Sequence, residues 1–480
     1  MNEKKQAALA AIEAKSDLVT QVSDALWGCA ELSLQEYKSA ALLCEAAEKE
    51  GFTVEKGICG IETAFSASYG HGKPVIGILA EYDALAGLSQ QAGQTEKTPL
   101  VPGGTGHGCG HNMLGAGALS AAIGVKQYLQ NTGASGTVIL FGCPGEEGGA
   151  AKAFMAREKL WYGLDAALTW HPADCSEAVT GSSNACIQVQ YLFHGVAAHA
   201  AGCPEKGRSA LDAVTLMNLG VEFLREHMDG KARIHYCVTN GGGVSPNVVP
   251  AEASVLYMVR CDQVKKALAL QDRVDKIAEG AALMTGTTFT RKFIDGIAET
   301  IPNHPLEALL HKNLTEIGVP QYTAEELSFA DKLAATFDAA GYVPGCGQAD
   351  PTYAAQVQAL QAQSSHAMND FVMPLFTGDA FCAGSTDVGD VSWECPTAQL
   401  YIAAWPNGCP GHSWQNVSCG ASSLGHKAVV QAGKILCASA IDLLEQPALL
   451  EAAKAEFLQR TAAGYDCPIP ADAVPVIPEL

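Results

Sequence analysis

Long apolar runs and clusters of basic residues are both missing from this sequence of 480 residues. No stretch reaches the about 18–20 consecutive apolar residues that a membrane-spanning helix needs, so we expect no membrane partner. There are 30 basic residues against 51 acidic ones, and the net charge of −21 argues against nucleic acid and anionic lipid as partners. An anionic substrate would therefore have to be attracted by a few locally placed cationic side chains.

Features of secreted proteins are also absent. The N-terminal segment MNEKKQAALAAIEAKSDL is charged and patterned like an amphipathic helix, without the apolar core and cleavage site of a secretory signal. The 17 cysteines are odd in number and irregularly spaced, so they do not outline a disulfide framework. We therefore expect a cytoplasmic protein in which most cysteines, Cys109 excepted, are small buried residues.

Nucleotide-binding motifs are missing from the glycine-rich loops. The sequence contains no G-x-x-x-x-G-K-[ST] and no G-x-G-x-x-G placed between a strand and a helix. These loops are therefore not expected to bind nucleotides, and another function has to explain them.

Apolar strands alternate with loops and helices in the first part of the chain, which predicts an α/β domain with a mostly parallel sheet. From residue 186 the pattern changes to strands with one polar face, separated by two helices, as is typical of a small α+β domain. We therefore predict a large domain formed by 1–185 and 298–480, with the α+β domain inserted over 186–297. Residues 321–380 are irregular in pattern and are interpreted as an insertion of unassigned fold.

Candidate metal ligands lie at or near the ends of the predicted strands, where functional groups gather in open α/β sheets. They are Asp83, Cys109, His111, Glu146, Glu147 and His171, with His412 in CPGHSWQ as a further candidate. The two glutamates lie in CPGEEGGA, bounded by proline and glycine directly after an apolar strand, which is not the setting of a solvated helix face. The joint occurrence of these residues predicts a metal site.

Two metal ions suit this set of side chains better than one. Thiolate, imidazole and carboxylate together bind zinc and related transition metals. Two ions about 3.5–4 Å apart need a bridging ligand, and bound water ionises near pH 7 instead of near 16. Neighbouring side chains on extended backbone point in opposite directions, so one of two adjacent glutamates can bind metal while the other acts as general base.

Six motifs, taken together and in order, resemble those of the M20 metallopeptidases. They are HGCGH, PGEEGG, WHP, GVAAHAA, SPNVVP and STDVGDVSW. The likeness covers essentially the whole chain and is greatest to the amidohydrolase branch of that family, in which a cysteine supplies the bridging ligand. It implies a zinc-peptidase-like catalytic domain and an inserted lid that forms a dimer interface. It also implies two divalent ions per subunit; the softness of thiolate favours zinc, whereas the family favours manganese.

The resemblance also implies a role for each candidate residue. Glu146 matches the general base and Glu147 the metal ligand beside it. The other implied ligands are Cys109, which bridges the ions, His111, His171 and His412. Asp83 matches an acid that orients a metal ligand, and Glu81 occupies a position where many relatives carry a histidine ligand. No role is implied for His107.

Three residues of the inserted domain match substrate-binding residues of the family. His199 in GVAAHAA matches a lid histidine that reaches into the active site of the partner subunit and stabilises the oxyanion. Asn247 and Arg260 match residues that bind the free carboxylate of the substrate. The physical chemistry agrees, because a protein with a net charge of −21 needs a placed guanidinium to hold a carboxylate.

The reaction implied is metal-assisted hydrolysis of the amide bond of an N-acyl amino acid. The first substrate to consider is p-aminobenzoyl-glutamate, a product of folate catabolism. A dipeptide, another N-acyl or aryl-acyl amino acid, or an indole-acetyl conjugate is a close alternative. The chain could also be a mainly structural subunit of a heterodimeric hydrolase, although the complete ligand set argues against this. Whether it forms a homodimer or a heterodimer with a related subunit is left open.

Overall fold

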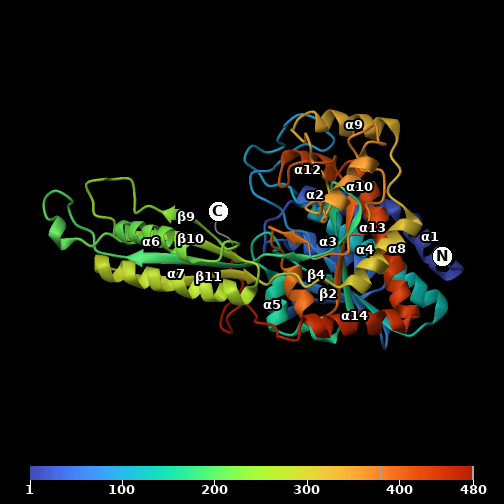
Figure 1. The fold of residues 1–480 in the computed structure, drawn as a ribbon, viewed down its shortest axis with the longest axis horizontal. Coiled ribbons are helices and arrows are strands. Elements are labelled where there is room, and N and C mark those ends of the chain that lie inside the picture. Colours follow the sequence, from blue (N-terminus) through green and yellow to red (C-terminus); the bar gives the residue numbers. More distant parts are fainter. Residues whose placement is uncertain (379, 478–480) are drawn as a thin grey trace.

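The computed structural model describes residues 1–378 and 380–477 and consists of a large domain from which a long, narrow inserted domain projects (Figure 1). The inserted domain begins with β8 at Ala185 and ends with β11 at Ile297. The chain therefore leaves the large domain once and returns once. Within the described ranges, no helix is both long and apolar enough to cross a lipid bilayer.

A seven-stranded sheet forms the centre of the large domain. Its strands, in spatial order, are β1 (Thr53–Lys56), β2 (Phe65–His71), β4 (Gly136–Gly142), β3 (Val75–Ala80), β5 (Ala166–Ala173), β13 (Thr397–Ala403) and β6 (Glu177–Val179). The four strands from β4 to β13 run parallel, whereas β1, β2 and β6 pair in antiparallel fashion. The sheet thus has the expected parallel centre, and its parallel strands end on a common side. Its antiparallel edges were not predicted.

Helices cover both faces of this sheet. One face is covered by α4 (His111–Thr132) and α13 (Ser423–Glu445), which pack on each other and on the strands. Around these two lie α1 (Glu3–Ala14), α2 (Ser16–Cys29), α3 (Tyr37–Lys49), α8 (His304–Ile317), α12 (Trp414–Gly420) and α14 (Pro447–Arg460). The other face is covered by α5 (Ala151–Arg157) and α11 (Val388–Glu394), which share a second apolar core.

The inserted domain is a two-layer α+β structure. Its antiparallel sheet has the order β11 (Thr288–Ile297), β8 (Ala185–His194), β10 (Glu252–Cys261) and β9 (Arg233–Asn240). One face of this sheet packs on α6 (Ala210–Leu224) and α7 (Val264–Thr285) in a core of its own. The alternation of buried and partly exposed residues along β8 and β10 follows from this one-sided packing.

Residues 321–378, whose pattern is irregular, contain two helices, α9 (Ala324–Ala334) and α10 (Pro351–Gln361). The segment is attached to the edge of the large sheet through buried Glu177 of β6. This carboxylate accepts hydrogen bonds from the N–H of Cys346 at 2.9 Å and from the hydroxyl of Tyr353 at 3.1 Å. Nearby, the short strands β7 (Ser182–Ser183) and β12 (Phe381–Cys382) form a parallel pair.

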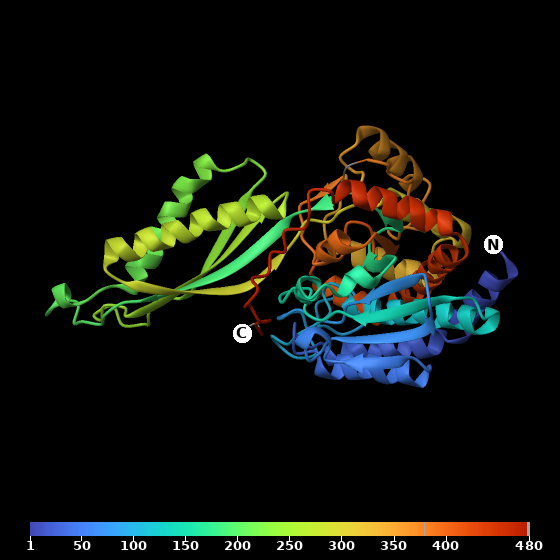
Figure 2. The ribbon, with the colours of Figure 1, turned by 90° about the horizontal axis from the view of Figure 1, so that it is seen from below.

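The segment 461–477 follows α14 and runs along the junction between the two domains (Figure 2). Tyr465 donates a hydrogen bond to Asp390 of α11 at 2.5 Å. A side chain added at Gly296 of β11 would meet the Cβ of Pro468 at 3.0 Å. This C-terminal segment therefore touches the large domain and the inserted domain at the same time.

Candidate metal centre

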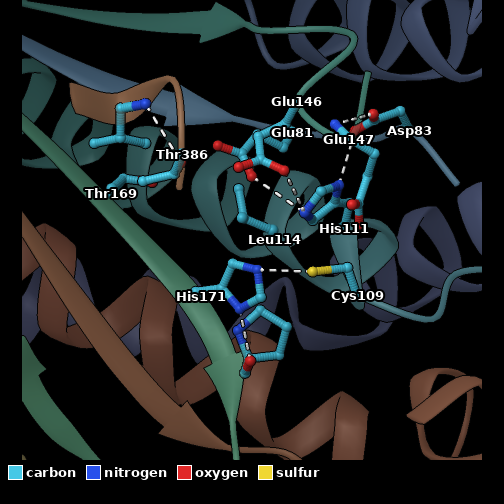
Figure 3. Close-up of polar contacts among 12 residues, drawn as sticks. Glu81, Asp83, Cys109, His111, Leu114, Glu146, Glu147, Thr169, His171 and Thr386 are labelled. Atoms are coloured by element: carbon cyan, nitrogen blue, oxygen red, sulfur yellow. Dashed lines mark hydrogen bonds and ion pairs between the residues drawn. The ribbon is translucent and has the colours of Figure 1, made fainter. Parts of the chain in front are cut away.

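Side chains that follow the parallel strands meet at the carboxyl ends of these strands (Figure 3). Asp83 follows β3, the pair Glu146–Glu147 follows β4, and His171 lies near the end of β5. Cys109 lies in the loop that leads into α4, and His111 is the first residue of that helix. Residues far apart in the sequence are thus brought together beyond the carboxyl ends of the strands, where open α/β sheets bind their ligands.

Gly110 sets the geometry between Cys109 and His111. It stands immediately before α4 with φ = 81°, in the left-handed region that glycine adopts without strain. A Cβ at this position would also lie 2.7 Å from the Cγ of Pro172. The glycine therefore allows a sharp turn after which both neighbouring side chains reach the same space.

The loop that carries Glu146 and Glu147 is held from two sides. Buried Glu36 accepts a hydrogen bond from the N–H of Gly145 at 2.8 Å. On the other side, Asp83 Oδ2 accepts the N–H of Glu147 at 2.9 Å. These contacts fix the backbone on both sides of Glu146 while leaving its side chain out of the loop's hydrogen bonds.

The first cluster consists of Cys109, His111 and His171, whose potential ligand atoms all lie within 4.8 Å of one another. Sγ of Cys109 is 3.3 Å from Nε2 of His171. The other ring nitrogen of His171, Nδ1, lies 2.7 Å from the carbonyl oxygen of Pro172 and donates to it. Its Nε2 lone pair is therefore directed at the cluster.

The second cluster consists of Cys109, Glu147 and His412, again within 4.8 Å. Nε2 of His412 is 3.5 Å from Oε1 of Glu147, and the His412 side chain is 55% exposed. The two clusters share Cys109, as a bridging ligand would. The second cluster is therefore open to solvent on the side of His412.

Asp83 links the two clusters. Its Oδ1 lies 2.8 Å from Nδ1 of His111, and its Oδ2 accepts the Glu147 N–H and the Ser33 hydroxyl, the latter at 2.7 Å. Burial alone would raise the pKa of Asp83, but the charge of His111 and these hydrogen bonds outweigh it and lower the pKa to about 2. The carboxylate therefore stays ionised and holds the imidazole with Nε2 turned inward.

Two buried atoms show that this donor set suits cations. Among the described residues, Nε2 of His111 and Oε1 of Glu147 are buried and have no hydrogen-bond partner. Burial, followed by the charge of Glu147, raises the pKa of the Cys109 thiol. Polar atoms left without a partner inside a protein cost free energy, and a bound cation would give both atoms a partner. Thiolate, imidazole and carboxylate ligands in two clusters fit a pair of divalent transition metal ions.

Glu146 lies beside the first cluster. Its Oε2 is 3.9 Å from Nε2 of His111. Burial is the main cause that raises the pKa of Glu146, and the negative charges of Glu81 and Glu147 add to it. A carboxyl group with raised proton affinity next to a metal centre can accept a proton from water.

Lys152 and Asp387 belong to the surroundings of the site, although the sequence did not predict them there. Lys152 on α5 is fully buried and lies 2.7 Å from Glu81 Oε1 and 2.5 Å from Asp387 Oδ1. The available signals were a single lysine inside the apolar segment AAKAFMA, shortly after Glu146, and an aspartate inside the motif STDVGDVSW. Neither signal alone distinguishes a buried charge from an exposed one.

His107 is buried and does not belong to either cluster. Its Nε2 lies 3.0 Å from the carbonyl oxygen of Leu26 on α2. Burial lowers the pKa of His107 to about 4, so the ring is neutral at physiological pH. Its position fits a structural role, in which it connects the ligand loop to α2.

The three candidate residues of the inserted domain lie at opposite ends of it. Arg260 is near the large domain, where it donates a hydrogen bond to Ser385 Oγ at 2.8 Å. His199 and Asn247 lie beyond the far ends of β8 and β10, where Ala200 N–H donates to the Asn247 carbonyl at 3.0 Å. A ten-residue strand such as β8 is about 30 Å long. The chain therefore does not bring His199 and Asn247 to its own metal centre.

Known proteins resemble this chain along nearly its full length. The M20 model of the peptidase dimerisation domain matches residues 181–284. The chain is 46% identical to the B subunit of p-aminobenzoyl-glutamate hydrolase from Escherichia coli (strain K12) over 472 residues, 97% of each chain. It is 25% identical to the Xaa-Arg dipeptidase of Mus musculus, over 94% of this chain and 92% of that one.

The fold is also similar to a solved structure. A dinuclear metal-binding peptidase of the M20 family from Bacillus subtilis has a TM-score of 0.54 at 17% identity, covering 90% of this chain and 99% of that chain. This likeness confirms the predicted α/β domain with an inserted domain, and the nearly full-length sequence identity confirms the resemblance drawn from the motifs. The chain therefore belongs to the M20 family of peptidases and amidohydrolases and is a hydrolase of that family.

Proposed function

We propose that this hydrolase cleaves the amide bond of N-acyl amino acids, and that p-aminobenzoyl-glutamate is its preferred substrate. The products would be p-aminobenzoate and glutamate. The observation that carries the proposal is the pair of ligand clusters that share Cys109, with the Glu146 carboxyl group beside them. The identity of 46% to the B subunit of the Escherichia coli p-aminobenzoyl-glutamate hydrolase supports this substrate.

The proposed cofactor is a pair of divalent ions, Mn²⁺ or Zn²⁺, in each subunit. The first cluster would hold one ion and the second cluster the other, with Cys109 common to both. When bound, such ions polarise the scissile carbonyl group and lower the pKa of water to near neutrality. The remaining steps belong to side chains of the protein.

Glu146 is the proposed general base and general acid. It accepts the proton of the attacking water, whose oxygen forms a bond to the carbonyl carbon. It then returns the proton to the leaving nitrogen as the C–N bond breaks. Burial, together with the charges of Glu81 and Glu147, raises its pKa, and this increased proton affinity supports the uptake of a proton in the first step.

We propose that residues of two subunits bind each substrate. His199 of the partner subunit would donate to the oxyanion, since its Nδ1 already accepts the N–H groups of Ala201 and Gly202 and its Nε2–H is left to donate. One well-placed donor of this kind stabilises the transition state by about 3–4 kcal/mol. The free carboxylate would be bound by Arg260 of the subunit that holds the metal centre and by Asn247 of the partner subunit.

The proposed assembly is therefore a dimer, either of two copies of this chain or with a related subunit. The match to a dimerisation domain supports it. Exposed Leu219 and Phe223 on α6 also support it, because they offer apolar surface to a partner. We place the protein in the cytoplasm, since all 17 cysteines are free, as in proteins of reducing compartments.

The proposal is tested by assaying the purified chain, without any other subunit, on p-aminobenzoyl-glutamate with added Mn²⁺ or Zn²⁺. We expect hydrolysis by the wild-type protein. We expect Glu146→Ala to lose at least about a hundredfold in kcat, because it lacks the proton acceptor, while it still binds both ions. Near-normal turnover by this variant would contradict the role of Glu146.

The same assay decides between this substrate and a dipeptide. The 25% identity to a Xaa-Arg dipeptidase favours a dipeptide with C-terminal arginine as the second candidate. A higher kcat/KM for such a dipeptide than for p-aminobenzoyl-glutamate would make the dipeptide the preferred substrate. Inactivity of the isolated chain on every substrate, followed by activity after addition of a related subunit, would instead indicate a mainly structural role.

A further inference from the structure

A buried cluster of three charged side chains adjoins the metal centre. The ammonium group of Lys152 lies between the carboxylates of Glu81 and Asp387, and all three side chains are at most 3% exposed. Burial alone would lower the pKa of Lys152, but the two carboxylates outweigh it and raise the pKa well above its usual value. One buried cation thus lies between two acids.

Retaining these charges inside the protein requires an explanation. Moving three charged groups out of water costs more free energy than packing apolar side chains of the same volume. The neighbours of Lys152 on α5, from Ala151 to Ala156, are buried and otherwise apolar. Asp387 additionally accepts the backbone N–H of Lys152 at 3.0 Å, so it fixes the start of the helix as well as the ammonium group. Buried charges next to a reactive centre point to a role in that centre.

Glu81 connects this cluster to the ligands. Its Oε1 is held by Lys152, and its Oε2 lies 3.3 Å from Nε2 of His111. Asp83 occupies the opposite nitrogen of the same ring. The His111 imidazole is therefore placed between two carboxylates, and Glu81 lies on the side of the nitrogen that has no hydrogen-bond partner. That is the side a cation would occupy.

We propose that Lys152 and Asp387 are positioning residues that hold Glu81 as a fixed negative charge beside the first cluster, where it strengthens the binding of one of the two ions. This inference rests on the proposed function, because it requires a two-ion centre. Among the described residues, the ligand groups that include Glu81 contain His111 and Glu146 but neither Glu147 nor His412. Glu81 therefore acts on the first cluster and not on the second, and the two ions are held unequally.

The experiment is a titration of metal-free full-length protein with MnCl₂ by calorimetry, with bound manganese counted by elemental analysis. We expect two equivalents for the wild type. In Glu81→Gln, one ion should bind about 10–100-fold more weakly, as is usual when a group that supports a metal ligand is lost, while the other keeps its affinity. The metal-free variant should unfold at a lower temperature than the wild type, because Lys152 keeps only one of its two buried carboxylate partners, yet it should still bind the other ion with wild-type affinity. A folding defect would not produce this pattern.

Variants of Lys152 test whether it acts through Glu81. Lys152→Met should weaken the same ion as Glu81→Gln, and Lys152→Arg should restore part of the affinity, because guanidinium can also pair with both carboxylates. The matched control is Lys5→Met, which breaks another buried pair, 2.6 Å from Asp442 with both side chains 4% exposed, between α1 and α13. This control should lower the unfolding temperature but leave both manganese affinities unchanged.

The outcomes separate this inference from the proposed function. If Glu81→Gln binds both ions as the wild type does, or loses affinity for both equally, the inference is wrong while the proposed function stands. The same holds if Lys152→Met changes manganese binding no more than Lys5→Met does. Wild-type protein that binds no divalent cation would overturn the proposed function and this inference together.

Discussion

The absence of a side chain at Gly110 determines where two of the candidate ligands lie. Gly110 stands between Cys109 and His111, with φ = 81° and no room for a Cβ beside Pro172. The same helix, α4, is followed directly by Gly133, which has φ = 63° but no atom within 4 Å of an added Cβ. Both glycines have the left-handed conformation, but only Gly110 has close neighbours. Comparing substitutions at the two positions therefore distinguishes the effect of backbone strain from the effect of moving the candidate ligands.

We predict that Gly110→Ala lowers the free energy of unfolding by more than the about 1–2 kcal/mol that a left-handed conformation costs an L-residue, and that it also weakens metal binding. The added methyl group would push the Cys109–His111 turn away from Pro172. Gly133→Ala should show the strain alone, with unchanged metal binding. Chemical denaturation and manganese titration of both variants measure the difference; equal effects of the two substitutions would contradict the prediction.

The sequence indicated the candidate ligands more clearly than the residues that surround them. Glycines around Cys109 and His111, and a glutamate pair between proline and glycine, are local signals that a single sequence displays. Lys152 and Asp387, by contrast, form a hydrogen bond between residues that are 235 positions apart in the sequence. Only the fold brings these two charges to Glu81, and each of them alone resembles an exposed residue.

Among the elements, residues 321–378 are attached to β6 partly through one buried acid, beside the hydrogen bonds of Ser176 with Asn369 and Met373. Glu177 accepts hydrogen bonds from Cys346 and Tyr353. Burial raises the pKa of Glu177 from 4.5 to about 7. Because the folded protein holds the proton more tightly than the unfolded chain, this contribution to stability is complete below pH about 4.5 and is lost as the pH rises through about 7.

We therefore predict that Glu177→Gln reduces the loss of stability that the wild type shows as the pH rises from about 5 to about 8. Glutamine is neutral throughout this range and keeps the size and an acceptor oxygen. Thermal unfolding at several pH values measures the slope, and Glu451→Gln, at an exposed position of α14, is the control. Parallel profiles for wild type and Glu177→Gln would show that the carboxyl group does not titrate as stated.

The pattern of elements was predictable where the residues alternate or run apolar, and less so elsewhere. The parallel centre of the large sheet and the strands β8 and β10 have such patterns. β11 carries Arg291 and Lys292 and has only two buried residues, so its composition resembles that of a loop. The antiparallel edges of the large sheet and the helices α9 and α10 depend on tertiary contacts such as those of Glu177, which periodicity does not report.

For the whole molecule, the length of the inserted domain is the decisive feature. It places His199 at the opposite end from the junction, about 30 Å away along β8. Under the proposed function, each active site then combines the metal centre of one subunit with the far end of the other. Two different inactive subunits can therefore complement each other.

We predict that mixing Glu146→Ala with His199→Ala, each inactive alone, restores activity after the subunits exchange. Half of the dimers would be mixed, and one of the two sites in each would be intact, so roughly a quarter of the wild-type activity should return. Hydrolysis of p-aminobenzoyl-glutamate after the mixture is dissociated and reassembled measures this. No recovery, in a mixture that size analysis shows to contain mixed dimers, would place His199 outside the partner's site.

The manner in which the inserted domain is joined restricts how it can swing. The chain enters on β8 and leaves on β11, and these strands are direct neighbours, with Cys186 opposite Ile297 at the junction. Two neighbouring strands that are hydrogen-bonded to each other can bend perpendicular to the sheet. Rotation about the long axis of the domain would instead break the hydrogen bonds between β8 and β11. We therefore expect any movement of the inserted domain to be a bend at this junction and not a rotation about its long axis.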